Sequence, residues 1–247
     1  MTSNTDLKYL DDTYADTGEA VVLRVGRDER GPYIVLDQTI FYPQGGGQPS
    51  DVGSIQADDL VINVSFVGFS EGQVLHYIAE EPSDLDGLVG RPCELRLDKA
   101  KRLKHARLHT AGHLIAGIID SQRGAMRATK GFHFEEGPYV EFQGEPDGEV
   151  DTFLATLQEK INLLIAEDSR VTAALVSHDE LKQRCWSVPT NLPEDKPLRT
   201  ITIESLEPSP CGGTHVYNLS ELGTLSVLKM KKRKGATKIS YRVGDVS

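Results

Sequence analysis

The sequence changes character at Asp98, and this change limits what the chain can fold into more than any other feature. Before it, apolar and polar residues alternate in short segments separated by turn-forming residues, such as those at positions 28–32. The segments with this pattern are residues 19–25, 33–36, 60–67, 74–78 and 93–97. Short strands at this spacing are typical of a small antiparallel barrel or sandwich. We therefore predict a β domain over residues 1–97 and a second domain over residues 98–247.

After Asp98 the apolar residues recur at three- and four-residue steps. Asp98 is a residue type that caps helix N-termini. The apolar positions that follow it are Leu103, Ala106, Ala111, Leu114, Ile115, Ile118 and Ile119. This period predicts an amphipathic helix that ends near Gly124.

Further along, helical and strand patterns mix. We expect a hairpin over residues 132–142 that turns at residues 136–137. The other expected elements are helices over residues 151–168 and 179–185 and strands over residues 171–176, 198–203, 223–230 and 238–243. The second domain is therefore expected to be of the α+β class.

The composition is that of a globular protein, with 38% hydrophobic and 26% charged residues, which excludes disordered and fibrous classes. The formal net charge is −10, so any RNA contact must come from a local basic surface. Two clusters qualify, and the alternative for both is an ordinary solvated surface. They are Lys231, Lys232, Arg233 and Lys234, flanked by Lys229 and Lys238, and Lys101 and Arg102, flanked by Lys99 and Lys104.

The cysteines and the N-terminal residues bear on the cellular compartment. Cys93, Cys185 and Cys211 are too few, and odd in number, for a disulfide framework, which favours a reducing compartment. The first residues contain neither a basic nor an apolar segment of a secretory signal, and no apolar run approaches a membrane span. We expect a cytoplasmic protein that does not contact a membrane.

Histidines and one cysteine form a candidate metal site. His109 and His113 are four residues apart on the expected helix, so both rings project from one face. Near the C-terminus, the segment Cys-Gly-Gly-Thr-His offers the side chains of Cys211 and His215 across a tight turn. Imidazole and thiolate suit zinc better than magnesium or calcium. Spacing alone leaves open whether the two halves meet, and His105, one turn earlier, is expected to flank the site.

Three motifs resemble those of a known family. Arg-x-His-Thr-Ala-x-His-Leu at residues 107–114 and Cys-Gly-Gly-Thr-His at residues 211–215 resemble the zinc motifs of the alanyl-tRNA synthetase editing domain. Residues 41–53, FYPQGGGQPSDVG, resemble its glycine-rich motif, and residues 130–144 fall where it has a hairpin. The chain thus resembles the AlaX family, free-standing relatives of that domain, in its medium-length form.

The resemblance implies a fold, an activity and a site. The fold would be an N-terminal β-barrel followed by an α+β editing domain of the kind shared with threonyl-tRNA synthetase. The activity would be hydrolysis of mischarged tRNA(Ala), first of all Ser-tRNA(Ala) and then Gly-tRNA(Ala). The zinc ligands would be His109, His113, Cys211 and His215.

The chemistry leaves a question about the zinc. Ester hydrolysis needs a positioned water and stabilisation of the oxyanion, which zinc provides when a coordination position is open. Four protein ligands usually indicate a closed structural site. Either one ligand is displaceable, or zinc anchors the substrate amino group while another group activates water.

Other residues are candidates for the pocket. Thr129 lies where the family has a polar pocket residue, so its hydroxyl is expected to recognise a serine side chain; an ordinary turn residue is the alternative. His133 is a candidate base or supporting residue. Gly45, Gly46 and Gly47 are expected to form a tight turn beside the pocket that Asp51 orients, rather than a nucleotide-binding loop.

Two other functions are compatible with the sequence. One is a non-catalytic RNA-binding module in which zinc is structural. The other is editing of Ser-tRNA(Thr) by the same fold.

Overall fold

A computed structural model describes residues 4–185, 197–233 and 235–244. Contacts divide the chain into two units. The first comprises Met1–Gly45 with Pro49–Lys104, and the second comprises Gly46–Gln48 with His105–Ser247. The division falls inside helix α1 (Lys99–Asp120).

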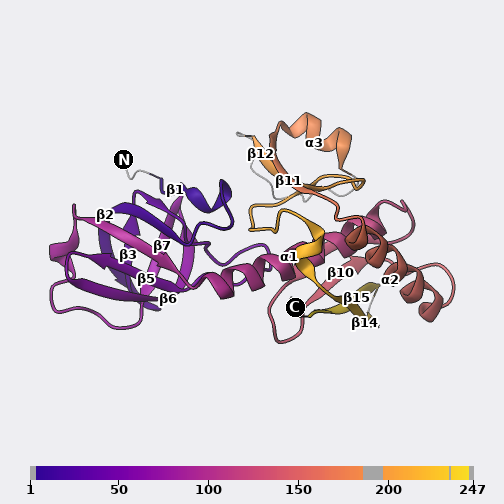
Figure 1. The fold of residues 1–247 in the computed structure, drawn as a ribbon, viewed down its shortest axis with the longest axis horizontal. Helices are drawn as coiled ribbons and strands as arrows, with labels where there is room; N and C mark the ends of the chain where they lie inside the picture. The colour runs from indigo at the N-terminus through magenta and orange to yellow at the C-terminus, as the bar shows by residue number, and fades with distance from the viewer. Residues whose placement is uncertain (1–3, 186–196, 234, 245–247) are drawn as a thin grey trace. The chain divides into compact units, whose positions relative to one another are not determined.

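The first unit is a closed antiparallel barrel of six strands (Figure 1). The strands follow the order β2 (Thr17–Asp28), β3 (Gly31–Leu36), β7 (Gln73–Ile78), β6 (Leu60–Ser70), β5 (Gly53–Ala57) and β8 (Pro92–Leu97), and β8 pairs with β2 to close the ring. A short parallel pair, β1 (Asp6–Leu7) and β4 (Gln38–Thr39), and two 3-10 turns, η1 (Lys8–Leu10) and η2 (Asp86–Leu88), complete the unit. Closure leaves the ring without an unpaired edge.

Alternation along the strands fills the barrel. On β6, Ile62 and Val64 are buried between exposed neighbours, and on β8 the same holds for Cys93 and Leu95. This period of two is the pattern that predicted the strands. Strand β5 escaped prediction because its short sequence, GSIQA, contains a single large apolar residue.

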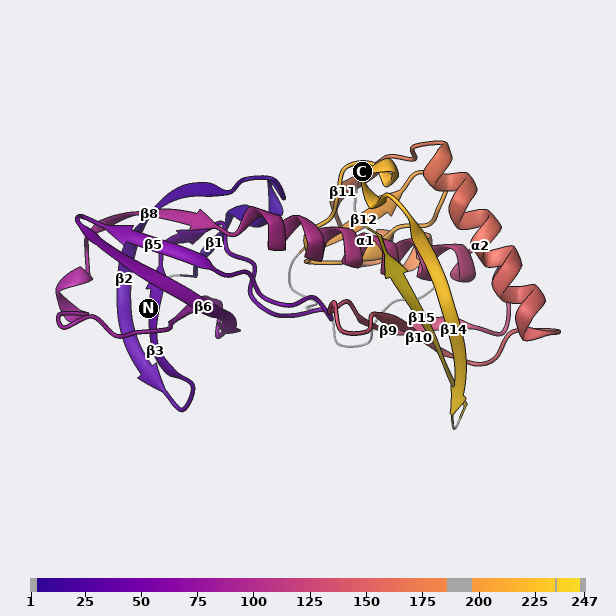
Figure 2. The same ribbon diagram turned by 60° about the horizontal axis from the view of Figure 1, so that its bottom comes forward.

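The second unit packs helices against two sheets. Its four-stranded sheet has the order β14 (Leu225–Arg233), β15 (Ala236–Val243), β10 (Tyr139–Gln143) and β9 (Arg127–Phe132), and its three-stranded sheet has the order β11 (Val171–Val176), β12 (Leu198–Ile203) and β13 (Ser209–Pro210). The C-terminal part of α1 lies between these sheets, and α2 (Val150–Ala166) lies beside β14 (Figures 1 and 2). Helix α3 (His178–Arg184) and the 3-10 turn η3 (Leu219–Leu222) complete the unit.

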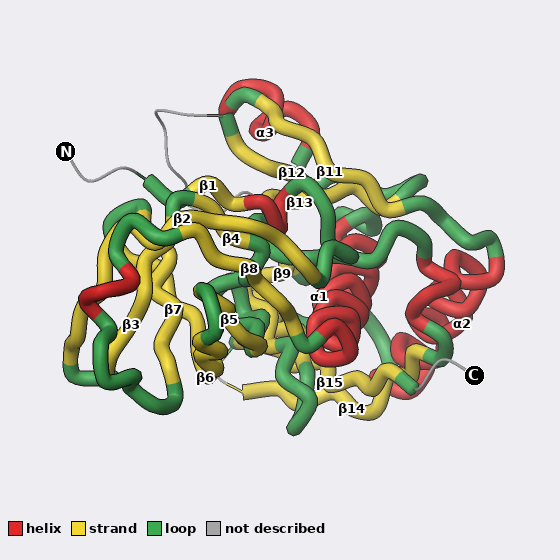
Figure 3. Tube along the Cα trace, turned by 60° about the vertical axis from the view of Figure 1, so that its left-hand side comes forward, coloured by secondary structure: helices red, strands yellow, loops and turns green. Residues whose placement is uncertain are grey.

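The core of this unit lies around α1. Leu114, Ile115 and Ile118 of the helix are buried with Phe142 of β10 and Ile239 of β15. Helices in red and strands in yellow are distinguished in Figure 3. No helix among the described residues is long and apolar enough to cross a membrane.

The structure confirms the predicted fold class, an N-terminal barrel with an α+β part. Strands β11 and β12 have the predicted bounds, and Asp98 caps α1 by accepting a hydrogen bond from the Lys101 amide at 3.1 Å. Several boundaries differ from the prediction by a few residues, including those of β9, β10, β14 and β15. The sequence also predicts that α1 ends near Gly124. The helix ends at Asp120, and β9 begins at Arg127, because the Asp120 carboxylate accepts a hydrogen bond from the Ala128 amide and so fixes the start of the strand.

Candidate metal centre

The four predicted ligands lie together within the second unit. Their ligand atoms are all within 4.8 Å of one another. His109 and His113 come from α1, and Cys211 and His215 from the loop after β13. The Cys211 Sγ is 3.5 Å from His109 Nε2 and 3.2 Å from His215 Nε2, so these rings present Nε2 to a common point. The two halves of the motif do meet.

Gln48 fixes the His109 ring. Its Oε1 accepts hydrogen bonds from the Thr214 amide at 3.1 Å and from His109 Nδ1 at 2.7 Å, while its Nε2 donates to the Thr214 hydroxyl. The Thr214 backbone N–H requires an acceptor, so the side-chain oxygen of Gln48 must lie on this side and therefore also faces His109. The His109 Nδ1 must then carry the proton. The lone pair of His109 is therefore on Nε2, facing Cys211.

Thr110 fixes the His215 ring in the same way. Its hydroxyl donates to the Ala106 carbonyl at 2.8 Å, so its single proton is used. The same oxygen lies 3.1 Å from His215 Nδ1 and 3.2 Å from the Val216 amide, and it must accept from both. His215 therefore also has its proton on Nδ1 and its lone pair on Nε2. Such partners orient metal-binding histidines in known sites.

Burial keeps the histidines neutral. It lowers the pKa of His113 to about 4 and holds the pKa values of His109 and His215 well below the ordinary value, with a further contribution from the Arg199 charge. Burial raises the pKa of the Cys211 thiol to about 11. Neutral imidazole is the form that binds a metal, whereas the thiol must lose its proton, so metal binding is expected to release a proton.

His133 lies beside the four ligands. Its ring stacks on His109 with 4.7 Å between centroids, and three glycines leave room for it. A Cβ atom at Gly112 would lie 2.2 Å from His133 Cε1, one at Gly131 2.1 Å from Nε2, and one at Gly47 3.3 Å from Cδ2. The Tyr241 hydroxyl donates to the Leu108 carbonyl and so accepts from His133 Nδ1 at 2.7 Å. His133 therefore has its lone pair on Nε2.

The donor set fits zinc. Three neutral imidazoles and one thiol lie within 4.8 Å of one another, and hydrogen bonds fix the rings of His109 and His215. This set matches the ligand types and number of zinc sites. His109 and His215 are buried, while His113 and Cys211 are partly exposed.

Comparisons with known proteins agree with this geometry. Residues 15–100 match the family of class II (A) tRNA synthetases. The alanyl-tRNA editing protein AlaX-M of Methanosarcina barkeri is 32% identical over 96% of this chain and 98% of its own length. That of Methanosarcina mazei is 30% identical over 96% of this chain and 95% of its own length.

The chain belongs to the AlaX-M family. It also resembles part of a longer enzyme. The alanine–tRNA ligase of Methanobrevibacter smithii is 29% identical over 98% of this chain, which corresponds to 27% of the ligase. The resemblance predicted from the three motifs is confirmed.

The glycine-rich motif, residues 41–53, is divided between the units. Gly46, Gly47 and Gln48 group with the second unit, where the Gly47 carbonyl accepts from the His133 amide at 2.8 Å. Gly45 and Asp51 group with the first. Asp51 accepts from the Tyr42 amide at 2.6 Å and forms a buried ion pair with Arg102.

Thr129 is the extra residue of a β-bulge in β9, since Lys130 pairs with Glu141 and Ala128 with Phe142. Its side chain is exposed, and its hydroxyl donates to the Glu141 carbonyl at 3.1 Å. These contacts are within the sheet.

The predicted basic residues have different environments. Lys101 is exposed, but Arg102 is 1% exposed and donates to Asp51, Thr13 and Ile40, so its guanidinium is not available to a phosphate. Lys231 is exposed, and Lys232 forms an ion pair with Glu145 at 2.9 Å. Arg233 ends β14, and Lys234 lies outside the described residues.

Sequence reasoning missed four residues that support the candidate ligands or His133: Gln48, Thr110, Thr214 and Tyr241. The first three lie inside the recognised motifs, and their polar side chains were the available signal. Tyr241 carried none, because only the pairing of β15 with β10 brings it near His133.

Proposed function

We propose that this chain is an aminoacyl-tRNA deacylase that hydrolyses mischarged tRNA(Ala), with Ser-tRNA(Ala) as first substrate and Gly-tRNA(Ala) as second. The four-residue ligand cluster supports this proposal most directly, because it joins the two motifs of the family in one place. The chain belongs to the AlaX-M family, whose relatives are named alanyl-tRNA editing proteins, and this membership supports tRNA(Ala) as the substrate.

The residues of the cluster would hold zinc and position the ester. When bound, zinc supplies a Lewis acid that polarises a carbonyl oxygen and lowers the pKa of water. Gln48 and Thr110 keep two rings in the ligating tautomer, so the cluster needs little reorganisation. The ester approaches on the side of His113 and Cys211, the partly exposed ligands.

His133 orients the attacking water in this proposal. Burial lowers its pKa to about 3, so the ring is neutral and its Nε2 accepts a hydrogen bond. A group with so low a pKa is a poor general base at neutral pH. The role is therefore to position water rather than to take its proton. We expect His133→Gln to lower turnover by roughly a hundredfold with unchanged bound zinc; loss of bound zinc in step with turnover would show that His133 supports the zinc site and does not position water.

Thr129 would provide the preference for serine. Its hydroxyl proton is used by Glu141, so its oxygen is left to accept a hydrogen bond from a serine side chain. A site that hydrogen-bonds a substrate hydroxyl favours that substrate over an analogue without the hydroxyl. Thr129→Val is expected to slow release of serine more than release of glycine. Equal effects on both substrates would exclude this role.

Deacylation assays test the function. Purified chain is mixed with Ser-tRNA(Ala), Gly-tRNA(Ala) and Ser-tRNA(Thr), before and after chelation and after return of zinc. We expect turnover of the first two that is lost on chelation and restored by zinc. Hydrolysis of Ser-tRNA(Thr) alone would show that the substrate is mischarged tRNA(Thr) instead of mischarged tRNA(Ala). Tight RNA binding without any turnover would favour a zinc-stabilised binding module, which the four protein ligands make the second candidate.

A further inference from the structure

The four-stranded sheet of the second unit has two different faces. Val140, Phe142, Ile239 and Tyr241 point into the core. Residues that alternate with these point away from it and form what we term the outer face. Residues directly opposite in paired strands share a face, so the register identifies the outer face across all four strands.

Two rows cross the outer face. One row runs Lys130, Glu141, Lys238 and Lys231 from β9 to β14, and the next runs Phe132, Tyr139, Ser240 and Lys229. Lys231 and Lys238 are directly opposite each other, a pairing of like charges that destabilises a strand pair. The ion pair of Lys238 with Glu141 offsets part of this repulsion.

Aromatic rings are stacked on this face. Phe132 and Phe134 have centroids 4.5 Å apart with an interplanar angle of 17°, and Phe132 and Tyr139 have centroids 5.3 Å apart at 16°. The Lys238 ammonium lies 4.1 Å from the Tyr139 centroid. All three rings are partly exposed rather than buried.

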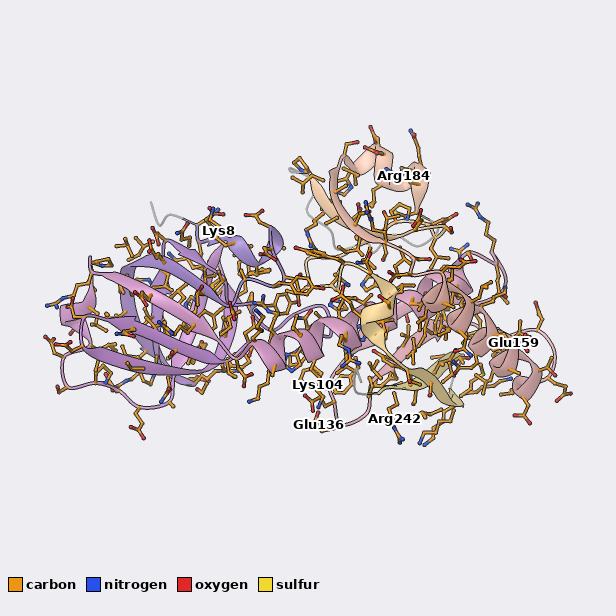
Figure 4. All side chains as sticks on the ribbon, in the orientation of Figure 1. Lys8, Lys104, Glu136, Glu159, Arg184 and Arg242 are labelled. Atoms are coloured by element: carbon orange, nitrogen blue, oxygen red, sulfur yellow. The ribbon has the colours of Figure 1, made fainter. Side chains whose placement is uncertain are left out.

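The charge of this face is opposite to that of the chain. The chain carries −10, but the two rows contain four lysines and one carboxylate. Lys130, Lys229 and Lys231 are exposed, and only Lys238 is paired with Glu141, at 3.3 Å. Arg242, on the same strand as Lys238, is also exposed and projects outward from β14 and β15 (Figure 4).

We infer that the outer face binds single-stranded RNA through base stacking on Phe132 and Tyr139 and phosphate contacts from Lys130, Lys229 and Lys231. Aromatic side chains within a basic surface are the combination that binds unpaired nucleotides, because flat rings stack on exposed bases whereas a duplex hides its bases. This inference rests on the proposed function for the source of the RNA, the unpaired 3′ end of tRNA that carries the ester.

The position of the face suits that substrate. Phe132 and His133 are adjacent in sequence, and one side chain lies on the outer face while the other stacks on His109. Strand β9 is the edge of its sheet among the described residues. A strand of RNA on the outer face can thus pass around this edge toward the metal centre.

The aromatic contribution is tested with a single-stranded RNA of roughly eight nucleotides that carries no aminoacyl ester, and its binding to the full chain is measured by fluorescence anisotropy. Phe132→Leu keeps most of the apolar volume but removes the ring. We expect the Kd of Phe132→Leu to be about tenfold higher than that of the unmodified chain, with the same salt dependence, and Phe132→Trp to bind as tightly as the unmodified chain. Thermal unfolding shows that each variant is folded.

The contribution of the lysines to RNA binding is tested through the salt dependence of the binding constant. Replacing both Lys130 and Lys231 by Ala removes two phosphate contacts, so the slope of log K against log salt should become shallower by about 1.4. The matched control replaces Lys160 and Lys182, exposed residues on α2 and α3, by Ala and should leave the slope unchanged.

Three results would overturn the inference: normal binding by folded Phe132→Leu, equal flattening of the slope by the control, or equally tight binding of duplex RNA. The assay uses RNA without an ester, so it does not depend on hydrolysis. Deacylation by the unmodified chain together with normal RNA binding by the variants would reject the inference and leave the proposed function standing.

Discussion

Single hydroxyl protons set the orientation of two histidines at the candidate metal centre, His215 and His133. Thr110 and Tyr241 each donate to a backbone carbonyl, of Ala106 and Leu108, and therefore can only accept from an imidazole. Burial holds the pKa of the Tyr241 phenol well above its ordinary value, so that proton is retained. The tautomers of His215 and His133 thus follow from bonds outside the cluster.

Replacing Thr110 by Val tests this arrangement. The change keeps the side-chain volume but removes the acceptor of His215 Nδ1, so we expect zinc affinity to fall by about 10- to 100-fold. Competition with a chromophoric chelator measures the affinity, and Thr110→Ser should retain it. Thr237→Val is the control, because this buried hydroxyl bonds the Gly144 carbonyl. Equal losses in both variants would indicate general destabilisation.

His76 makes the stability of the barrel depend on pH. Burial lowers its pKa to about 4, and its ring bonds the Ile34 carbonyl and the Thr39 hydroxyl. Below pH 6.5 the unfolded chain binds a proton that the native chain does not, so acid destabilises the fold. The loss should reach about 3 kcal/mol as the pH falls from 6.5 to 4.

The His76 contribution is measured from urea unfolding followed through the barrel at several pH values. His76→Gln is expected to be less stable at pH 7 and to lose less stability on acidification. An identical pH dependence in both proteins would show that other groups cause the acid loss.

Among the secondary-structure elements, α1 carries a glycine, Gly112, where the helix faces the His133 ring. Gly112 is in the middle of a helix, where glycine is less stable than alanine by about 1 kcal/mol. A Cβ there would lie 2.2 Å from the His133 ring, which is itself enclosed by Gly131 of β9. The helix therefore gives up stability to hold this ring against His109.

Gly112→Ala should destabilise the chain by about 1–2 kcal/mol, because overpacking outweighs the gain in helix propensity. The control is Gly117→Ala in the same helix, whose new methyl group would meet only the flexible end of Leu206. Chemical denaturation compares the two. Stabilisation by Gly112→Ala would show that His133 moves aside at little cost.

At the scale of the whole molecule, all four ligands belong to one of the two units. A metal that binds only the native state stabilises the unit that holds its ligands. We expect calorimetry to resolve two unfolding transitions, one for each unit. Free zinc at about 100 times its Kd should stabilise the second unit, which holds the four residues, by about 2.7 kcal/mol. The barrel transition should not respond. One transition that shifts as a whole would show that the units unfold together.

Most local elements and the candidate ligand set were predictable from the amino-acid sequence alone. Periods of two and of 3.6 are local properties, so β11, β12 and α1 were predictable from residues close together in the chain. His109, His113, Cys211 and His215 followed from two short motifs whose residue types suit zinc.

Only the tertiary structure decided which distant residues meet. Gln48 reaches His109 across 61 positions, and Tyr241 reaches His133 across 108. Arg102 appeared basic and available in the sequence, yet the fold buries it against Asp51. Strand pairing likewise gathers Lys130, Lys231 and Phe132 on one face. The physical reason is that long-range contacts depend on packing and register, which no local period specifies.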